Sequence, residues 1–456
     1  MSPKALGGGT AVNAMVWTWG DRRDWDLWTE KSGLEGWTYE DMKPYLQQLE
    51  TYEYPDPSGV RGRDGNVHVS MYKPNDVTLQ AINSASGVFD IPVVADNNAG
   101  LHEAVSVLQR NMRGDNPVTA QRQGSWLSFL LRANESLDNL EVVTSATVTK
   151  VMLEDHPGLG GAKVATGVKV LVEGDCIEVS ARKEVILSTG AHNTPKVLML
   201  SGIGNATELR EVGVTPLVDL PAVGKNMLDH INPGSLIFFS DPRDDYDGNL
   251  VGAYGRTSVG ATDVTPDVEF GYIMGPAQED REAWPHVPAI VMFYCLMLNH
   301  DALGSIRLFD NDPLSDPLIE SGYFKTVADQ RRVVEIFRLL FKWASVMHEV
   351  IPMTQATGGP YPLRVDPDSS DEDILGQVKH TVDTHWHVAG TCRMGHASDP
   401  AAVTDGKMRV QGVERLRVVD ASVMPNLPNG HPMAVLMALG LRAADWIAED
   451  DQAEGG

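Results

Sequence analysis

The sequence predicts an α+β fold in which the first, central and last segments form one domain and the rest folds over it. The chain has 456 residues, of which 42% are hydrophobic, enough to build two packed cores. Between Leu140 and Ser188, β-branched residues recur in short alternating runs, which is typical of strands. Amphipathic spacing near Ala328–His348 and an apolar segment after His431 predict long helices. No repeat with a period of about 20 to 50 residues is present, so a solenoid or propeller is excluded.

The first part of the chain is predicted to consist mainly of loops. Residues 20–28, GDRRDWDLW, alternate charged and aromatic side chains after a turn, and we interpret them as a packed surface loop. Thr38, with Asp41 three residues later, has the spacing of a capping box and predicts a helix through about Glu50.

The segment from Leu140 to Ser188 predicts a strand meander that ends in a buried strand. Glu173-Gly174-Asp175 supplies a turn signal between two of its runs. In GAHNTPKVLMLSGIG, which follows, we expect a helix from about Thr194 to Gly202. Near the C-terminus, Leu416–Ser422 predicts a strand and is followed by the closing helix.

The charge balance excludes two classes of partner. The chain carries 37 Lys and Arg against 62 Asp and Glu, a formal net charge of −25. Such a surface repels phosphate backbones and anionic headgroups, so we expect no nucleic-acid partner and no membrane association. The longest apolar runs, such as Ala289–Leu298, are shorter than the ~20 residues that a bilayer crossing needs. No secretory signal is recognisable, and the compartment stays open.

The residues that could bind a metal ion are the cysteines and a histidine pair. Cys176, Cys295 and Cys392 are too few and too scattered for a disulfide framework or a zinc site, and we interpret them as buried thiols. His385 and His387 would share one face of a strand, as two ligands do. No third or fourth ligand is evident nearby, so we predict no metal.

The chain begins with a glycine triplet, LGGGTAVNAM, that suits close contact with a ligand. Gly7, Gly8 and Gly9 allow positive φ angles and leave the backbone uncovered, and Thr10 and Asn13 follow with polar side chains. Taken alone, the triplet more often indicates an unstructured N-terminal turn. The chain contains no G-x-x-x-x-G-K or G-x-G-x-x-G motif that would identify the ligand of this loop.

Two histidines near the C-terminus form the strongest candidate site. His387 precedes a Gly-Thr-Cys turn, and His431 stands directly before Pro432 and an apolar helix. Proline at the first helical position predicts that the helix N-terminus faces the site and favours a developing anion. One imidazole can accept an alcohol proton while the other holds the oxygen. A lone histidine is more often a core residue, but this pair beside irregular, glycine-containing backbone favours catalysis.

Two other segments have a functional and a simpler interpretation. Asp229 and His230 in VGKNMLDH are either a catalytic dyad or part of a turn closed by a local bond from the aspartate to the backbone, and we prefer the turn. VMFYCLMLNH (Val291–His300) either lines a pocket for an apolar or aromatic alcohol or is a core strand, and we prefer the strand.

Six blocks of sequence together resemble the glucose–methanol–choline (GMC) family of FAD-dependent oxidoreductases. They are LGGGTAVNAM with DRRDWDLW, GRDGNVHVS, GAHNTPKVLMLSGIG, VGKNMLDH, WHVAGTCRMG, and the stretch from VTDGKMRVQG to GLRAADWI. They follow the family's order and span almost the whole chain. The resemblance implies an α/β-type FAD-binding domain with an incomplete Rossmann-like sheet (residues 1–35, 130–232 and 376–456). Residues 36–129 and 233–375 would form a substrate domain and cap on an antiparallel sheet with helices.

The resemblance also implies which residues contact the cofactor. Those that match the segment wrapping the flavin and pyrophosphate are Gly7, Gly8, Gly9, Thr10 and Asn13. Those that match positions at the adenine and at a turn near the nucleotide are Val148, Gly190 and Ala191. Those that match positions at the ribityl-pyrophosphate and the pyrimidine ring are Asp420, Ala421, Pro432 and Met433. Some members bond covalently to the flavin through a histidine where this chain has Val12, so we expect non-covalent FAD.

The reaction implied is FAD-dependent oxidation of a primary or secondary alcohol. His387 matches the family's base, which takes the hydroxyl proton while the carbinol carbon gives a hydride to flavin N5. His431 matches the second site residue, which orients the alcohol oxygen. The electrons would then pass to O2 or to another acceptor.

The sequence departs from the family pattern at its start. Family members open with a strand, a G-x-G-x-x-G turn and a helix, and this chain does not contain that unit. A truncated gene model, a split protein and a degenerate homologue would each account for this. We favour truncation and expect an in-frame G-x-G-x-x-G upstream of Met1. Two other functions stay open: a redox-silent lyase or cyclase of the same fold, and a remnant that cannot bind FAD.

Overall fold

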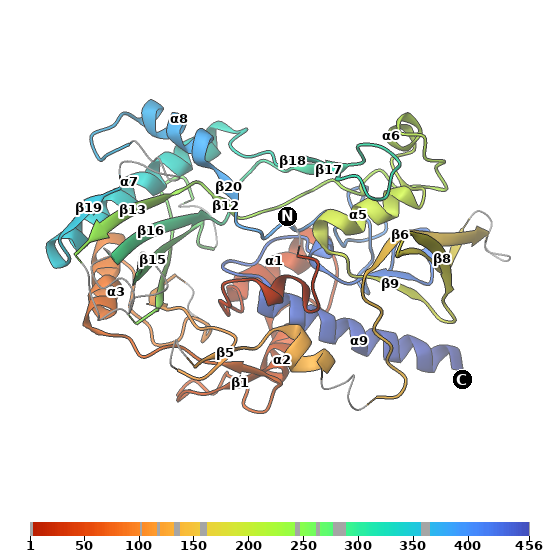
Figure 1. Ribbon diagram of the computed structural model, residues 1–456, viewed down its shortest axis with the longest axis horizontal. Coiled ribbons are helices and arrows are strands. Elements are labelled where there is room, and N and C mark those ends of the chain that lie inside the picture. The colour runs from red at the N-terminus through yellow and green to blue at the C-terminus, as the bar shows by residue number, and fades with distance from the viewer. Residues whose placement is uncertain are drawn as a thin grey trace.

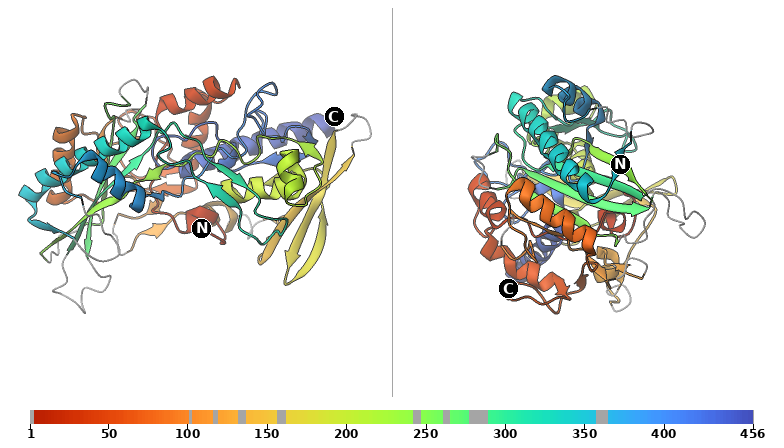
Figure 2. Two further views of the ribbon diagram at one scale, coloured as in Figure 1. Left: turned by 90° about the horizontal axis from the view of Figure 1, so that it is seen from above. Right: turned by 90° about the vertical axis from the view of Figure 1, so that its left-hand side faces the viewer.

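A large antiparallel sheet and a smaller sheet lie toward opposite ends of an elongated molecule (Figure 1). The computed structural model describes residues 3–100, 103–115, 119–131, 137–155, 162–241, 247–260, 265–276, 289–356 and 365–455. The C-terminal helix α9 (Met433–Gly455) begins between the two sheets and runs beside the smaller one (Figure 1). The described N-terminal segment lies near the middle of the molecule, close to the start of α9 (Figures 1 and 2).

The large sheet has eight strands among the described residues. Its main order is β19-β13-β16-β15-β14-β3, and β12 pairs with both β16 and β20. The strands are β3 (Val105–Val107), β12 (Ile231–Asn232), β13 (Ser235–Ser240), β14 (Leu250–Gly255), β15 (Val268–Pro276), β16 (Ala289–Met297), β19 (Met353–Gln355) and β20 (Asp383–Thr384). All pairings in this sheet are antiparallel.

Two helices cover one face of this sheet and form a core with it. They are α3 (Asp76–Phe89) and α7 (Val327–Val350), which pack against each other and against strands of the sheet (Figure 2). Alternate residues of β16 contribute to this core, as expected for a strand with one face buried. The core-strand interpretation of Val291–His300 is therefore confirmed, as is the α+β class with an antiparallel sheet and helices.

The smaller sheet confirms the predicted meander. β6 (Ala146–Asp155) pairs with β7 (Lys163–Val172), which pairs on its other edge with β8 (Asp175–Ser180) and β21 (Val413–Glu414). Glu173 and Gly174 have φ angles of 52° and 96° and turn the chain between β7 and β8. The strand predicted to be buried, β9 (Val185–Leu187), pairs in parallel with β22 (Leu416–Val418). It is buried on one face only, because Ile186 is exposed.

The remaining strands form short pairs. They are β1 (Glu50–Tyr52) with β2 (Val67–Val69), β4 (Met112–Arg113) with β5 (Gln121–Arg122), β10 (Ile203–Gly204) with β11 (Val218–Asp219), and β17 (Ser305–Arg307) with β18 (Leu318–Glu320). The further helical segments are η1 (Gly8–Ala11), α1 (Arg22–Ser32), α2 (Tyr39–Leu49), η2 (Trp126–Leu130), α5 (Gly190–Leu200), α6 (Ala206–Glu211), α8 (Asp371–Thr381) and η3 (Ala421–Val423).

The capping box correctly predicted α2. A second capping box begins α1, so the surface-loop interpretation of residues 20–28 is wrong. The Thr38 hydroxyl accepts from the Asp41 amide, and the Asp41 carboxylate accepts from the Thr38 amide. Asp21 and Asp24 form an equivalent box at the start of α1. Trp25 and Trp28, three residues apart, then lie on the buried face of that helix.

Two main clusters of buried side chains divide the chain differently from the predicted domains at several points. The first contains Leu308 and residues from 17–69, 151–223 and 389–446, and the second contains residues from 77–107, 231–297 and 324–378. Leu308, Ile231 and Val378 each pack in the cluster opposite to their predicted domain. Residues 36–69, which we assigned to the substrate domain, pack in the first cluster because α2 lies against α9. The domain division otherwise stays a prediction.

The cysteine prediction is partly wrong. Cys295 and Cys392 are buried free thiols, whereas Cys176 is exposed because it lies on β8, a strand whose residues all face solvent. Among the helices described, none has the length and apolar character needed to span a bilayer.

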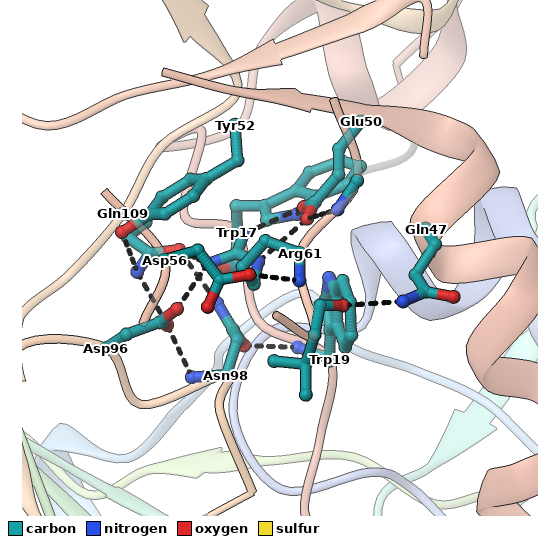
Figure 3. Close-up of polar contacts among 12 residues, drawn as sticks. Trp17, Trp19, Gln47, Glu50, Tyr52, Asp56, Arg61, Asp96, Asn98 and Gln109 are labelled. Carbon is teal, nitrogen blue, oxygen red and sulfur yellow. Dashed lines mark hydrogen bonds and ion pairs between the residues drawn. The ribbon is translucent and has the colours of Figure 1, made fainter. Parts of the chain in front are cut away.

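A buried ion pair between Arg61 and Glu50 ties separate segments of the first cluster together (Figure 3). Both side chains are fully excluded from solvent. Arg61 Nε and Nη2 donate to the two carboxylate oxygens of Glu50, each at 2.7 Å. Arg61 Nη1 donates to Gln109 Oε1 at 2.7 Å and to Asp96 Oδ2 at 2.9 Å, and the guanidinium lies 3.9 Å from the centre of the Tyr52 ring.

The same network holds the extended segment Trp17–Trp19. The Trp17 indole N–H donates to Glu50 Oε2 at 2.8 Å. Asn98 binds the backbone on both sides of Thr18, since its Nδ2 donates to Trp17 O and its Oδ1 accepts from the Trp19 amide (Figure 3). The position of Thr18 is therefore fixed by groups that Arg61 and Glu50 organise.

We expect Arg61→Met to lower the free energy of unfolding by about 3–5 kcal/mol, because Glu50 would keep a buried charge without its partner. Equilibrium urea unfolding of the whole chain measures this. Lys325→Met is the matched control, since it removes an exposed ion pair with Glu320 and should leave stability almost unchanged. Equal effects of the two substitutions would contradict the central role of the buried pair.

Candidate active site

Four histidines from three separate segments meet between the two cores. His387 is central to the group, with ring centroids 5.0 Å from His230, 4.9 Å from His385 and 5.1 Å from His431. The short antiparallel pair β12–β20 brings His230 beside His385, whose amide donates to His230 O at 3.0 Å. His431 arrives from the loop that leads into α9.

His387 is hydrogen-bonded to His230 through one ring nitrogen, and its surroundings keep it neutral. The Nδ1 atoms of the two rings are 2.9 Å apart, so one donates and the other accepts. Burial lowers the pKa of His387 well below its usual 6.5, and the neighbouring histidines add to the effect. The pKa of His230 is lowered well below its usual value for the same reasons. Burial also lowers the pKa of His385 to about 3.

Asp229 fixes the backbone that carries His387, which corrects the turn interpretation of Asp229-His230. Its Oδ1 accepts from the His387 amide at 3.0 Å, a bond that spans 158 residues of sequence. Its Oδ2 accepts from the Tyr323 hydroxyl at 2.5 Å and from the Thr384 hydroxyl. The local bond that we predicted is thus replaced by long-range ones, because the carboxylate is buried between strands and not at a surface turn.

His431 is held by its backbone and by its ring. The Thr18 hydroxyl accepts from the His431 amide at 2.8 Å and donates to its carbonyl at 2.9 Å. His431 Nε2 lies 3.3 Å from Glu269 Oε1, a fully buried carboxylate on β15. Tyr254 and Tyr294 flank Glu269, and burial together with its charge raises the pKa of both phenols.

The start of α9 lies directly after these contacts. The Pro432 carbonyl accepts the first helical bond, from the Leu436 amide at 2.9 Å, so Pro432 is the cap and Met433 the first helical residue. The sequence predicts Pro432 as the first helical residue, one position further into the helix than the structure has it. The free N–H groups of the first turn follow immediately after His431.

The N-terminal glycine loop lies beside this helix start. Asn13 Nδ2 is 3.0 Å from Met433 Sδ, and Arg122 Nη1 donates to both Asn13 O and Asn13 Oδ1. The loop is a 3-10 turn closed by a bond from the Thr10 hydroxyl to Gly7 O, and it is not an unstructured turn. Gly8 has a φ of 53°, and a Cβ added there would meet no atom within 4 Å.

A second group of the predicted cofactor residues gathers around Asp420. Asp420 Oδ2 accepts from the Gly190 amide at 2.9 Å and from the Thr194 hydroxyl at 2.6 Å. Helix α5 therefore begins at Gly190 and not at Thr194, because a distant carboxylate caps it. The predicted strand to Ser422 ends at Val418 because Asp420 also caps η3 through the Ser422 amide.

Two hydrogen bonds connect this second group to the segment that follows His387, and a cavity lies near it. The Gly390 amide, three residues after His387, donates to Ala421 O at 3.1 Å, and the Thr391 hydroxyl donates to Ala191 O at 2.7 Å. A cavity of about 260 Å³ is lined by Val148, by residues 167–168 and 179–181 of the small sheet and the turn after it, and by residues 184–189, which directly precede Gly190 in the sequence. The structure thus brings the predicted residues together in two groups, one at the start of α9 and one at the start of α5.

Sequence reasoning missed the groups that hold the two histidines. Glu269 had a signal, since it is the single charged residue in an otherwise apolar strand. His230 had a signal, since Asp229-His230 suggests a catalytic dyad in the sequence. Thr18 had no signal, because its role depends on a contact with a residue 413 positions away.

Comparison with known proteins places this chain in a family. GMC oxidoreductase family models match residues 1–232 (N-terminal model) and 300–440 (C-terminal model). Alcohol dehydrogenase [acceptor] from Pseudomonas putida is 30% identical, over 97% of this chain and 81% of its own length. Mitochondrial choline dehydrogenase from Homo sapiens is also 30% identical, over 97% of this chain and 75% of its own length. Pyridoxine 4-oxidase from Mesorbium loti has a similar fold, with a TM-score of 0.82 and 24% identity, over 98% of this chain and 84% of its own.

The chain therefore belongs to the GMC oxidoreductase family. This confirms the resemblance stated from the sequence, the fold class and the oxidoreductase class. Family membership implies FAD as the cofactor.

We expect Thr18→Val to impair catalysis more than its cost in stability explains. The resemblance assigns His431 to orienting the alcohol oxygen, and small misplacements of such a group are costly. Loss of both bonds to His431 should therefore lower kcat by about 10- to 100-fold, with a smaller change in KM. The free energy of unfolding should fall by only about 1–3 kcal/mol.

Thr18→Ser keeps the hydroxyl and should restore kcat, which serves as the control. Steady-state kinetics and urea unfolding of the three proteins decide the question. Equal kcat in the valine and serine variants would show that the hydroxyl does not position His431.

Proposed function

We propose that this protein oxidises a primary or secondary alcohol with non-covalently bound FAD, using His387 as the base and His431 to orient the substrate oxygen. The observation that carries the proposal is the pair itself, with ring centroids 5.1 Å apart at the start of α9. The names of the two sequence relatives, an alcohol dehydrogenase and a choline dehydrogenase, support a CH–OH donor.

The residues around the site fit a flavin dinucleotide. Gly8, Gly9 and Gly190 each leave open space where a side chain would stand, as close approach of a ligand to the backbone requires. The cavity beside Val148 has the apolar wall that a base or ring needs. The residues that would hold FAD are Gly7, Gly8, Gly9, Thr10, Asn13, Val148, Gly190, Ala191, Asp420, Ala421, Pro432 and Met433. When bound, FAD supplies the acceptor for the carbinol hydrogen and its two electrons.

The contact with His230 prepares His387 to accept a proton. When His387 carries its hydrogen on Nδ1 and donates it to His230 Nδ1, the lone pair of His387 Nε2 is left free. The lowered pKa keeps this nitrogen unprotonated at neutral pH. The bond from the His387 amide to Asp229 holds the ring in place for the transfer.

His431 is held in position to orient the substrate oxygen. Glu269 orients its ring, and the Thr18 bonds fix its backbone. The N–H groups of the first turn of α9 follow directly after His431, and the N-terminal end of a helix favours negative charge near it. The substrate is a small alcohol, and the electrons pass on to O2 or to another acceptor.

We expect the purified chain to bind FAD and to lose its visible flavin absorbance when an alcohol substrate is added without oxygen. Acid precipitation should release all of the flavin, because Val12 offers no group for a covalent bond. His387→Gln should slow the bleaching by about 10²–10⁴-fold, as expected for loss of a general base. His380→Gln, an exposed histidine on α8, is the control and should bleach normally.

The same spectra separate the alternatives. Flavin that stays oxidised with every alcohol would support a redox-silent lyase or cyclase, and a colourless protein would support a remnant unable to bind FAD. Adding O2 or an artificial dye to the reduced enzyme distinguishes an oxidase from a dehydrogenase.

The pH dependence of the reductive step follows from the state of His387. The active base is unprotonated, so the rate falls as pH drops through its pKa, and the lowered pKa places that fall well below pH 6.5. Stopped-flow reduction of the flavin at a series of pH values measures this. A fall in rate centred at or above pH 6.5 would contradict the assignment.

A further inference from the structure

His385 has no role in the proposed reaction, yet its ring faces both proposed catalytic histidines. Its centroid lies 4.9 Å from that of His387 and 5.5 Å from that of His431. Its Nδ1 is buried and has no hydrogen-bond partner among the residues that the structure describes. A buried nitrogen with a lone pair and no partner is costly unless a ligand binds it.

The three rings converge in the way that metal ligands do. One ring nitrogen from each of His385, His387 and His431 lies within 4.8 Å of the other two. Three imidazoles with a fourth position open are a common arrangement for Zn2+, with Zn–N bonds of about 2.0–2.1 Å. That geometry needs nitrogens ~3.4 Å apart, so small rotations of the side chains would close the site.

The groups behind the rings also match a metal site. His387 shares a hydrogen bond with His230, and His431 faces the carboxylate of Glu269. Ligating histidines usually engage a carboxylate or another polar group with their second nitrogen, which orients the ring toward the ion. His385 is the one ring of the three whose position the proposed function leaves unexplained.

We propose that His385, His387 and His431 form a binding site for a divalent transition ion of the Zn2+ type, and that the bound ion switches alcohol oxidation off. Three nitrogen ligands favour Zn2+, Co2+ or Ni2+ over Mg2+ and Ca2+, which prefer oxygen. Coordination occupies the lone pair with which His387 would take the hydroxyl proton, and removal of the ion restores it. Inhibition rests on the proposed function, whereas binding of the ion does not.

Titration of the purified protein with ZnCl2 by calorimetry, without alcohol, tests the binding. We expect one Zn2+ per chain, no comparable binding of Mg2+, and a loss of affinity of at least about 10–100-fold in His385→Gln. The control His380→Gln removes an exposed histidine and should bind Zn2+ as the unaltered chain does. Equal affinity in His385→Gln, or no Zn2+ bound by the unaltered chain, would overturn the site.

A cobalt spectrum provides the second test and covers the case in which His385→Gln does not fold. Co2+ in a tetrahedral site gives visible bands, and His385→Cys should keep the ion and add a sulfur-to-cobalt charge-transfer band. A Co2+ spectrum that His385→Cys leaves unchanged would also overturn the proposal.

Inhibition is measured separately, as the zinc concentration that halves alcohol oxidation relative to each protein's own metal-free rate. EDTA should restore the rate, and in His385→Gln the midpoint should rise by the same factor as the dissociation constant. Zinc bound through His385 in a protein that oxidises no alcohol would support the site while refuting the proposed function. Oxidation unaffected by bound zinc would overturn the inhibitory role.

Discussion

The buried Arg61–Glu50 ion pair is the constraint on which the geometry of the site depends. A charge pair removed from water is stable only when its geometry is good and its remaining hydrogen-bonding groups are satisfied. Here Trp17, Asp96 and Gln109 meet those demands, and in doing so they bring separate segments of the chain together. The network holds the backbone on both sides of Thr18, and the Thr18 hydroxyl binds the backbone of His431. The interior of the first core is thereby connected to one of the two proposed catalytic histidines.

The sequence predicts elements well where the determining groups are close together along the chain. The Thr38–Asp41 box, the Glu173–Gly174 turn and the periodicity of α7 are all local, and each gave the element that the structure has. Predictions were wrong where a distant group decides the outcome. Asp420 caps α5 from 230 residues away, and the Asp229 carboxylate binds a backbone amide 158 residues away.

In the candidate site, too, the residues with local sequence signals could be predicted and those that depend on distant contacts could not. His387 and His431 could be found because each has a turn or a helix start beside it in the sequence, and they lie together in the structure. Their roles remain predictions. Glu269, His230 and Thr18 gain significance only through contacts between β15, the β12–β20 pair and the N-terminal segment. The sequence shows no evident third ligand near His385 and His387, whereas in the structure His431 lies within reach of both.

The bond between Thr18 and His431 also determines when the protein can finish folding during its synthesis. At about 5–20 residues per second, the ribosome needs about 20–80 s to add the 413 residues that separate the two partners. Throughout that time Trp28 and Trp37 lack the partners that cover them, Asn426 and Trp446. The tryptophans of the first helical segments therefore stay without these partners until the C-terminal segment has been synthesised, which exposes apolar surface that favours aggregation.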